Sequence, residues 1–425
     1  MKPFTYIIDR TVGFEKEEGE TLLQHGQPLS QNRIFILLLI AGIFAVIGFS
    51  MFLTTVSWYA ISAMGSPTAV GLVLMAATIP RLVMMMFGGV VADKYKKTTI
   101  MFMTNLIQAF VLFSLYVLVD NEILTLTVLL VIAGVFGMLD AFFGPASMSL
   151  IPKVVPKKQL QRANSIFQGA DQISFIVGPI FAGLMMESLG VASSFLVATI
   201  LVFLSAVFIF PPFIKEAAVD ERVSQNPWQD MKEGMSFVRN SSFLLTGLIV
   251  LISLNFFVFG ALHIAIPLLV DVYGGSPLNL SFMEASLGIG MLIGSVLLSI
   301  YTIQKRRGAV TIYGLMASLG LFILFSLVPS LPFLTAILFF IGFSMVFVYV
   351  PFFTVAQENT ENRIMGRVMS IIFLAMNGFD PVSYGIVTGF VSIGIPVQMV
   401  LFGLGVSGLL IALTVFFKAR EFREV

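Results

Sequence analysis

The chain has no cysteine, only two histidines, and charged side chains at just 11% of its 425 positions. Without cysteine there is no disulfide framework and no thiolate ligand, and we expect neither a metal site nor a cofactor. Soluble proteins carry roughly 25% charged residues, so this composition excludes a large soluble globular protein. The net charge of +1 gives no reason to expect a nucleic acid partner, and we expect none.

Several functional patterns are also missing. The sequence has no phosphate-binding G-x-x-x-x-G-K-[ST] loop, so ATP is not expected to drive the protein directly. It has no H-E-x-x-H or G-x-S-x-G pattern, and we therefore do not expect an enzyme. A channel would need a filter loop or a ring of charged residues, and neither is recognisable.

What the chain has is apolar sequence. Hydrophobic residues make up 58% of it, with 43 Phe and 23 Met. Apolar runs of about 20 residues, the length of a membrane-spanning helix, recur along its whole length. We predict an all-α, multi-pass protein of the cell inner (plasma) membrane, with twelve spans near residues 34–60, 71–92, 98–119, 123–150, 165–186, 192–214, 243–270, 279–302, 309–328, 332–355, 367–391 and 394–417.

The basic residues predict the orientation. All but one of the 24 Lys and Arg lie in the two tails or in alternate connections, and the opposite loops contain none. Because cytoplasmic loops retain positive charge, both termini are expected in the cytoplasm. The exception is Arg81, which lies inside a span.

A charged connection divides the spans into two groups of six. We predict a cytoplasmic segment 1–32, a six-helix bundle 33–214, a linker 215–242, a second six-helix bundle 243–417 and a tail 418–425. Within the linker, Trp228, Met231 and Met235 have helical spacing, which indicates an amphipathic helix on the inner membrane surface. A solvated linker with one buried Trp is the alternative. Paired six-helix halves are typical of transporters with a pathway between them.

Residues 88–97, GGVVADKYKK, follow the second span directly. Gly89 and Asp93 lie four residues apart and therefore share a helix face. An aspartate at a helix edge can accept hydrogen bonds from the N–H groups that begin another helix, so it can join two helix ends. The lysines, by contrast, are explained by topology alone.

This segment resembles the signature of the major facilitator superfamily, with departures at Lys96 and Thr98. The resemblance extends over the whole chain and is closest to the branch of drug:proton antiporters that contains macrolide-efflux pumps and the enterobactin exporter. The residues that carry it, besides the signature, are Ile79-Pro80-Arg81, FFGPASMSLIPKVVPKKQLQRANS over 142–165, EGMSFVRN over 233–240 and GRVMS over 366–370.

The resemblance implies a cytoplasmic gate. In this family the signature aspartate holds the two halves together by docking on the start of the eleventh span when the cavity faces outward. The residues implied here are Gly89, Asp93, Lys94 and Lys97 on one side, with Gly366 and Arg367 on the other. Such a contact at a helix end contributes about 0.3–1 kcal/mol when exposed, which is weak enough to open.

A second signature lies in the fifth span. Proton-driven exporters of the family carry a glycine-rich stretch here, and this chain has Gly178, Pro179, Ala182 and Gly183. The resemblance implies antiport. Small residues and a proline also suit plain helix packing, and this alternative stays open.

Four ionisable residues lie well inside predicted spans, where a charge is costly and indicates function: Arg81, Asp140, Asp171 and Asp380. A proton-driven carrier needs such a carboxylate, and we rank Asp140 first, Asp171 second and Asp380 as the reserve. A structural ion pair is the alternative. Glu284 and His263 lie nearer the outer side, where a hydrated position explains them equally well.

The substrate site is weakly marked. Polar and aromatic residues in the middle of two spans suit an adaptable apolar cavity: Asn255, Phe256, Phe259, Met376 and Asn377. Lipid-facing Phe and helix-bonded Asn are the alternatives. Taken together, we predict a monomeric, proton-coupled exporter of a hydrophobic or amphipathic small molecule such as a drug, macrolide or siderophore, working by alternating access, with membrane lipid around it. A lipid or metabolite facilitator of the same fold, without proton coupling, is the second hypothesis.

Overall fold

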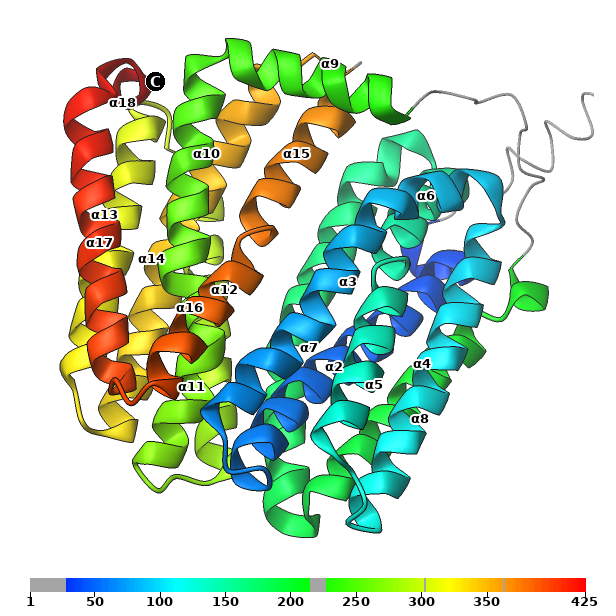
Figure 1. Ribbon diagram of the computed structural model, residues 1–425. Helices are drawn as coiled ribbons and strands as arrows, with labels where there is room; N and C mark the ends of the chain where they lie inside the picture. Colours follow the sequence, from blue (N-terminus) through cyan, green and yellow to red (C-terminus); the bar gives the residue numbers. More distant parts are fainter. Residues whose placement is uncertain (1–27, 215–226, 302, 362–363) are drawn as a thin grey trace, which may run out of the picture.

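The computed structural model describes residues 28–214, 227–301, 303–361 and 364–425; the side chains of residues 86–94, 157, 161, 227–231 and 366 lie outside this description. Twelve helices of the described chain are long and apolar enough to cross a membrane, which confirms the predicted number of spans. Figure 1 shows them as two groups of upright helices, with α9 crossing one end.

The first group runs from Arg33 to Phe208. Its helices are α2 (Arg33–Ser62), α3 (Pro67–Lys94), α4 (Lys97–Asp120), α5 (Leu126–Asp140), α6 (Phe143–Val154), α7 (Leu160–Leu189) and α8 (Val191–Phe208). Three short 3-10 turns lie at Leu29–Gln31, Lys157–Gln159 and Pro211–Phe213.

The second group follows α9 (Pro227–Asn240). Its elements are α10 (Ser242–Leu254), the π-helix η4 (Asn255–Gly260), α11 (Ala261–Val272), α12 (Pro277–Ile300), α13 (Arg307–Leu327), α14 (Leu331–Glu358), α15 (Met365–Asn377), α16 (Asp380–Ser392), α17 (Val397–Lys418) and α18 (Arg420–Glu424).

Two spans that the sequence analysis treats as single helices are interrupted. The fourth span consists of α5 and α6, and the eleventh consists of α15 and α16. Pro145 lies in the first turn of α6 and Pro381 in the first turn of α16. Proline suits the first turn of a helix and has no N–H to donate to a preceding turn, so both breaks occur where the sequence permits a restart. Asp140 ends α5 and Asp380 begins α16.

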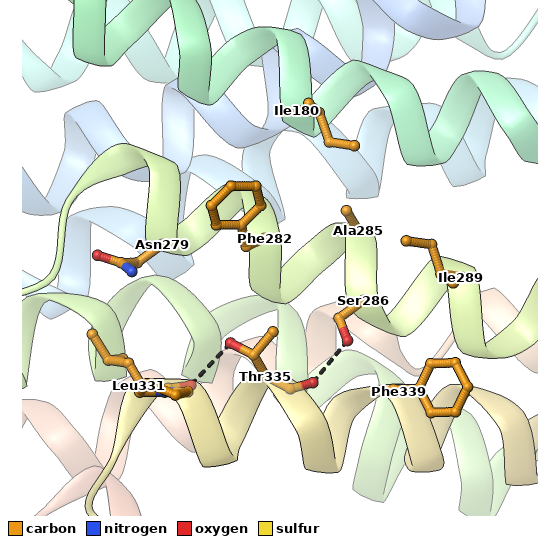
Figure 2. Close-up of a pocket in the computed structure, with 10 residues that line it drawn as sticks. Ile180, Asn279, Phe282, Ala285, Ser286, Ile289, Leu331, Thr335 and Phe339 are labelled. Carbon is orange, nitrogen blue, oxygen red and sulfur yellow. Dashed lines mark hydrogen bonds between the residues drawn. The ribbon is translucent and has the colours of Figure 1, made fainter.

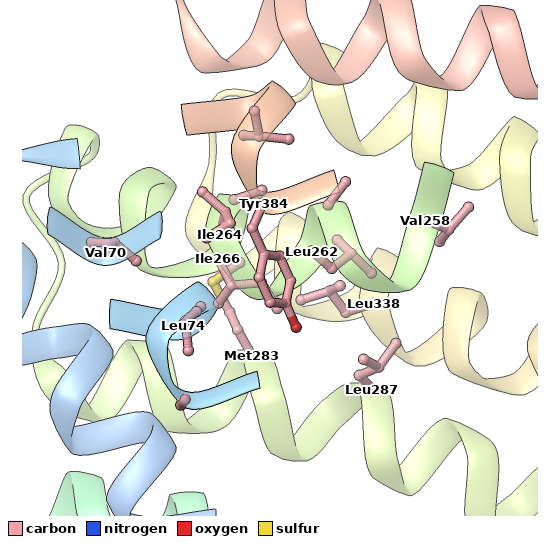
Figure 3. Close-up of a cluster of buried hydrophobic side chains, with 14 of the residues drawn as sticks. Val70, Leu74, Val258, Leu262, Ile264, Ile266, Met283, Leu287, Leu338 and Tyr384 are labelled. Carbon is pink, nitrogen blue, oxygen red and sulfur yellow. The ribbon is translucent and has the colours of Figure 1, made fainter. Parts of the chain in front are cut away.

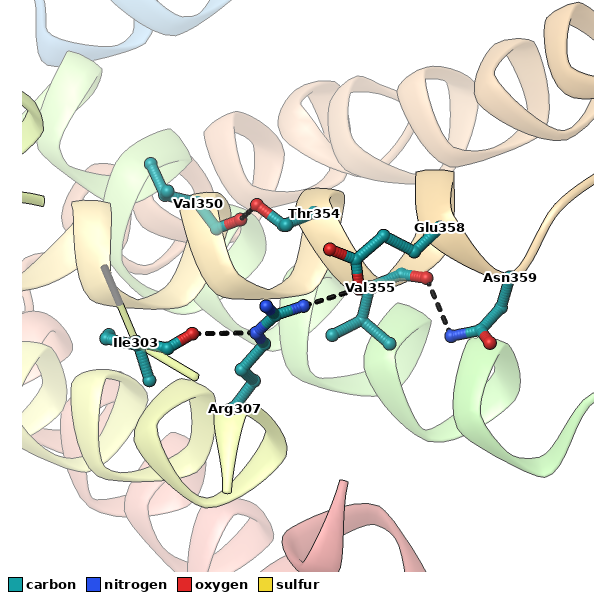
Figure 4. A network of polar contacts seen from close by, with 7 residues as sticks. All are labelled: Ile303, Arg307, Val350, Thr354, Val355, Glu358 and Asn359. Carbon is teal, nitrogen blue, oxygen red and sulfur yellow. Dashed lines mark hydrogen bonds and ion pairs between the residues drawn. The ribbon is translucent and has the colours of Figure 1, made fainter. Parts of the chain in front are cut away.

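The α9 end of the second group is held by polar contacts. Arg307, the first residue of α13, donates from Nε to the carbonyl oxygen of Ile303 at 2.8 Å and from Nη1 to the Glu358 carboxylate of α14 at 2.5 Å (Figure 4). The backbone N–H of Arg307 donates to the carbonyl of Val425, so the C-terminus lies at this end. The network therefore joins α13, α14 and the end of the chain.

The two groups of helices pack together near the opposite end, which carries the loops 63–66, 273–276 and 393–396. We call this interface the seam; it is formed by α2, α3 and α7 against α11, α12 and α16. Figure 3 shows Tyr384 of α16 inside a buried cluster that includes Leu74 of α3 and Met283 of α12. Toward α9 the groups diverge, and α15 packs on α9 and α10 (Figure 1).

Candidate functional site

The centre of the first group contains an ion pair. Arg81 Nε of α3 lies 2.9 Å from Asp140 Oδ2 of α5, and the guanidinium carbon lies 4.8 Å from the ring centroid of Phe49 on α2. The aromatic ring face attracts the cation, so three helices share one charged group. The Arg81 side chain is 37% exposed and that of Asp140 18%, so neither is completely enclosed.

The helix packing brings this pair together. A Cβ on Gly137 of α5 would lie 1.9 Å from the carbonyl oxygen of Ala77 on α3, so the two backbones approach more closely than any other residue would allow. Gly137 is three residues before Asp140, and Ala77 is four residues before Arg81. The contact between α3 and α5 therefore sets the position of both charged residues.

Asp380 lies across the seam from this ion pair. It is 6% exposed, and its Oδ1 atom is buried without a hydrogen-bond partner among the described residues. Arg81 is close enough to act electrostatically on Asp380 and on Tyr384, one turn further along α16. The Tyr384 hydroxyl also lies near Thr78 of α3. Charged and polar residues of both groups therefore meet near mid-span.

Of the four predicted intramembrane charges, Asp171 stands apart. Its Oδ1 would lie 3.9 Å from a Cβ placed on Gly42 of α2. In the part of the chain that the structure describes, Asp171 forms no ion pair with Arg81. The structure thus places Arg81, Asp140 and Asp380 together and leaves Asp171 separate, while the role of each stays a prediction.

The predicted cavity residues lie on η4 and at the end of α15. Asn255 accepts a hydrogen bond from the Tyr349 hydroxyl at 3.0 Å and donates to the carbonyl of Leu251 at 2.8 Å. Asn377 donates to the carbonyl of Phe373. The amide groups thus have protein partners, as the helix-bonded alternative requires.

The remaining cavity residues are apolar. Phe256, Phe259 and Met376 are partly exposed. π-Helical turns are frequent at functional sites, and irregular backbone at membrane depth occurs where it is buried in protein or lines a cavity.

The residues of the predicted antiporter motif of α7 make close packing contacts, and the role of the motif stays a prediction. Pro179 cannot donate to the carbonyl of Phe175, and Ser50 of α2 donates to that oxygen instead, at 3.3 Å. A Cβ on Gly178 would lie 2.6 Å from Ser50 Cβ, and one on Gly183 would lie 2.0 Å from Ser281 Oγ of α12. Ala182 is completely buried. The motif therefore joins α7 to its own group and, at Gly183, to the other one.

Only part of the predicted gate can be located. The side chains of Gly89, Asp93, Lys94 and Gly366 lie outside the described residues. Lys97 is 4% exposed at the start of α4. Arg367 forms an ion pair with Glu233 of α9, and Gly234 of α9 packs against Arg367 and Ile371. The start of the eleventh span is thus held by α9, a contact that the sequence analysis did not predict.

The sequence analysis also missed polar residues in the seam. Thr78 and Tyr384 were not singled out, although Tyr384 lies four residues after Asp380 and shares its helix face. Glu284 accepts a hydrogen bond from Thr54 Oγ1 at 2.6 Å, across the seam between α2 and α12. The available signal was the small-residue spacing of Ser281 and Gly288 on either side of Glu284.

A lateral pocket with a volume of about 590 Å³ lies between α7, α12 and α14 (Figure 2). Ile180, Phe282, Ile289 and Phe339 contribute apolar side chains. Ser286 donates to the carbonyl of Thr335, so its hydroxyl is already bonded. The pocket lies on a face of α12 different from that of Glu284 and does not include the charged cluster.

Twelve spanning helices in two groups, with charged residues at their interface, define a polytopic membrane transporter. A family model described as Major Facilitator Superfamily matches residues 38–379, and the chain belongs to that family. It is a multi-pass protein of the plasma membrane, and several of its relatives are named as exporters or efflux proteins.

Among these relatives, the putative bacilysin exporter BacE of Bacillus subtilis (strain 168) is 28% identical over 305 residues, or 70% of this chain and 74% of that protein. Macrolide efflux protein A of Enterococcus faecalis is 26% identical over 293 residues, or 67% of this chain and 88% of that protein. The multidrug efflux pump Tap of Mycolicibacterium fortuitum is 24% identical over 358 residues, or 80% and 86%.

Solved structures show the same fold. An auto-inhibited POT family peptide transporter has a TM-score of 0.71 at 12% identity, with 92% of this chain and 98% of that chain covered. The nucleoside transporter NupG has a TM-score of 0.66 at 16% identity, with 91% and 99% covered. At these identities the likeness concerns the fold alone.

Proposed function

We propose that the protein exports a hydrophobic or amphipathic small molecule, such as a drug, macrolide or siderophore, by proton-coupled alternating access. The relatives named as efflux proteins support the direction of transport. The observation that carries proton coupling is the cluster of Arg81, Asp140 and Asp380, which spans both groups of helices near the seam.

The cluster suggests how coupling works. In alternating access the two groups rock against each other, so the distance from Arg81 on α3 to Asp380 on α16 changes between states. Asp140 keeps its partner because α3 and α5 belong to the same group. A carboxylate whose cation moves away binds a proton more readily, and one whose cation returns releases it. Proton binding is thereby linked to the position of the two groups.

The distribution of Lys and Arg among the loops supports an assignment of which side of the membrane the open end of this structure faces. If the α9 end is cytoplasmic, the closed seam lies on the outer side and the structure represents an inward-facing state. In this structure, Glu233 of α9 pairs with Arg367 in the first turn of the eleventh span. In the outward-facing state Asp93 would take the place of this contact.

The coupling proposal is tested with purified Asp140→Asn, Asp171→Asn and Asp380→Asn proteins in proteoliposomes. Removing the coupling acid should abolish export against a substrate gradient and leave downhill movement, since the pathway remains. Loss of a merely structural ion-pair member should reduce expression and thermal stability first. Full gradient-driven export by all three variants would refute proton coupling through these residues and favour the facilitator.

A further inference from the structure

Glu284 lies on α12 in the seam. Thr54 Oγ1 of α2 donates to its Oε2 at 2.6 Å, and Thr54 is 2% exposed. No other hydrogen bond or ion pair of Glu284 occurs in the described part of the chain. A carboxylate of one helix group is thus bonded only to a hydroxyl of the other.

The seam around Glu284 is tightly closed. Ser281 and Gly288 lie three residues before and four residues after it, and therefore on the same face of α12. Ser281 is completely buried against Gly183 of α7, and a Cβ on Gly288 would lie 2.6 Å from Ile176 of α7. Glu284 itself is partly exposed, and these contacts restrict the water that can reach the seam side of its carboxyl group.

No cation of the described residues forms an ion pair with the Glu284 carboxylate. Glu284 is the only ionisable residue of α12, and Thr54 is its only hydrogen-bond partner among the described residues. None of the ionisable residues on the helices packed against α12 forms a hydrogen bond or ion pair with Glu284. These residues are Arg33 and Tyr59 of α2, Arg162, Asp171 and Glu187 of α7, His263 and Asp271 of α11, and Tyr349 and Glu358 of α14. In the closed seam, an ionised Glu284 would lose bound water and keep a single hydrogen bond, so its desolvation would be poorly compensated.

We propose that Glu284 is a proton-operated lock of the seam: the seam closes when the carboxyl group is protonated and opens when it is ionised. This inference deepens the proposed proton-coupled export and rests on it. It adds a second proton-binding group, outside the Arg81, Asp140 and Asp380 cluster.

The lock follows from the difference in hydration between the two states. When α12 moves away from α2 and α7, water reaches Glu284 and the ionised form is tolerated. Closing the seam removes much of that water, so the carboxylate first takes a proton from hydronium in the compartment that the open seam faces. The neutral carboxyl still accepts the hydrogen bond of Thr54. The seam can therefore close only after Glu284 has bound a proton. The change from the open to the closed seam, which returns the empty carrier to its starting state, thus depends on proton uptake.

The test measures the seam directly. The chain has no cysteine, so Asn121→Cys, in the turn after α4, and Ser392→Cys, at the last residue of α16, introduce unique sites for spin labels at the seam end of the two groups. Distances between the labels are measured in lipid nanodiscs between about pH 5.5 and about pH 8.5. In the otherwise unchanged protein, the ratio of long to short distances should rise about tenfold or more with pH.

Glu284→Gln keeps the size and the acceptor for Thr54 but cannot ionise. It should give the short distance at every pH. Glu187→Gln, which neutralises an exposed carboxylate of α7, is the matched control and should keep the pH dependence. Thr54→Val removes the donor and keeps the acid, so it should move the midpoint without abolishing the response.

An unchanged pH dependence in Glu284→Gln would overturn the lock. If Glu284→Gln misfolds, Glu284→Asp decides the question: the shorter side chain cannot reach Thr54, so a midpoint and a long-distance fraction equal to those of the unchanged protein would also overturn it. Because these measurements need neither substrate nor a gradient, their failure is distinct from a failure of gradient-driven export.

Discussion

Substituting Gly183 tests whether the two groups of helices separate at the seam. A Cβ at this position would lie 2.0 Å from Ser281 Oγ and 3.0 Å from the carbonyl oxygen of Pro277, both on α12. Gly183→Ala should therefore destabilise the closed seam while leaving the open seam unaffected. Overpacking by a methyl group costs about 1–3 kcal/mol. The ratio of open to closed molecules should thus increase about 5- to 150-fold.

The assay is the distance between spin labels at residues 121 and 392. Gly169→Ala is the matched control, because Gly169 lies on the same helix with no neighbouring atom within 4 Å of its Cβ position. Both substitutions raise helix propensity equally, so that effect cancels. Adding Ser281→Gly to Gly183→Ala removes the nearest clashing atoms and should restore much of the closed population.

Two results would refute this reasoning. One is a Gly183→Ala distance distribution equal to that of Gly169→Ala. The other is a population of open molecules that Ser281→Gly does not reduce. Either would mean that the seam does not separate at Gly183, and that the tight contact is part of a permanently joined core.

The remaining predictions concern topology and the gate. A cysteine at Asn121 should react with an impermeant thiol reagent added outside whole cells and one at Lys96 should not, and the reverse pattern would overturn the orientation; Thr98 is unsuitable because it is buried. Asp93→Asn removes a charge at constant size and should shift the population toward the state with a closed seam, whereas unchanged label distances at the α9 end would leave Asp93 without a gating role.

The fold was predictable because the membrane restricts the possible structures. Uninterrupted apolar runs such as the third span reappear as one helix, α4, with bounds close to those expected. The breaks after Asp140 and before Asp380 were not predicted, because proline in the first turn of a new helix and proline inside a continuous helix look alike in sequence. The contact of Arg367 with Glu233 was also hidden, since it joins residues more than a hundred positions apart.

The sequence predicted which residues belong to the candidate site better than it predicted how they are arranged in space. Position inside a span was enough to mark Arg81 and Asp140 as candidates. The number of residues between each of them and the end of its span indicated that the two lie at similar depth in the membrane. Which acid Arg81 meets depends on the approach of Gly137 to Ala77, a packing detail without a sequence signal. Glu284 was given a hydrated position as an equal alternative because it lies away from mid-span, and its hydrogen bond with Thr54 of α2 across the seam had no sequence signal.

Transport by the unmodified protein in proteoliposomes tests the central claim most directly. A macrolide or a hydrophobic fluorescent dye serves as the probe, with an imposed pH gradient and an ionophore control. The account predicts that the probe accumulates chemically unchanged against its concentration gradient when a proton gradient runs the opposite way, and that the ionophore abolishes this accumulation. Equal flux with and without the pH gradient would contradict proton-coupled export.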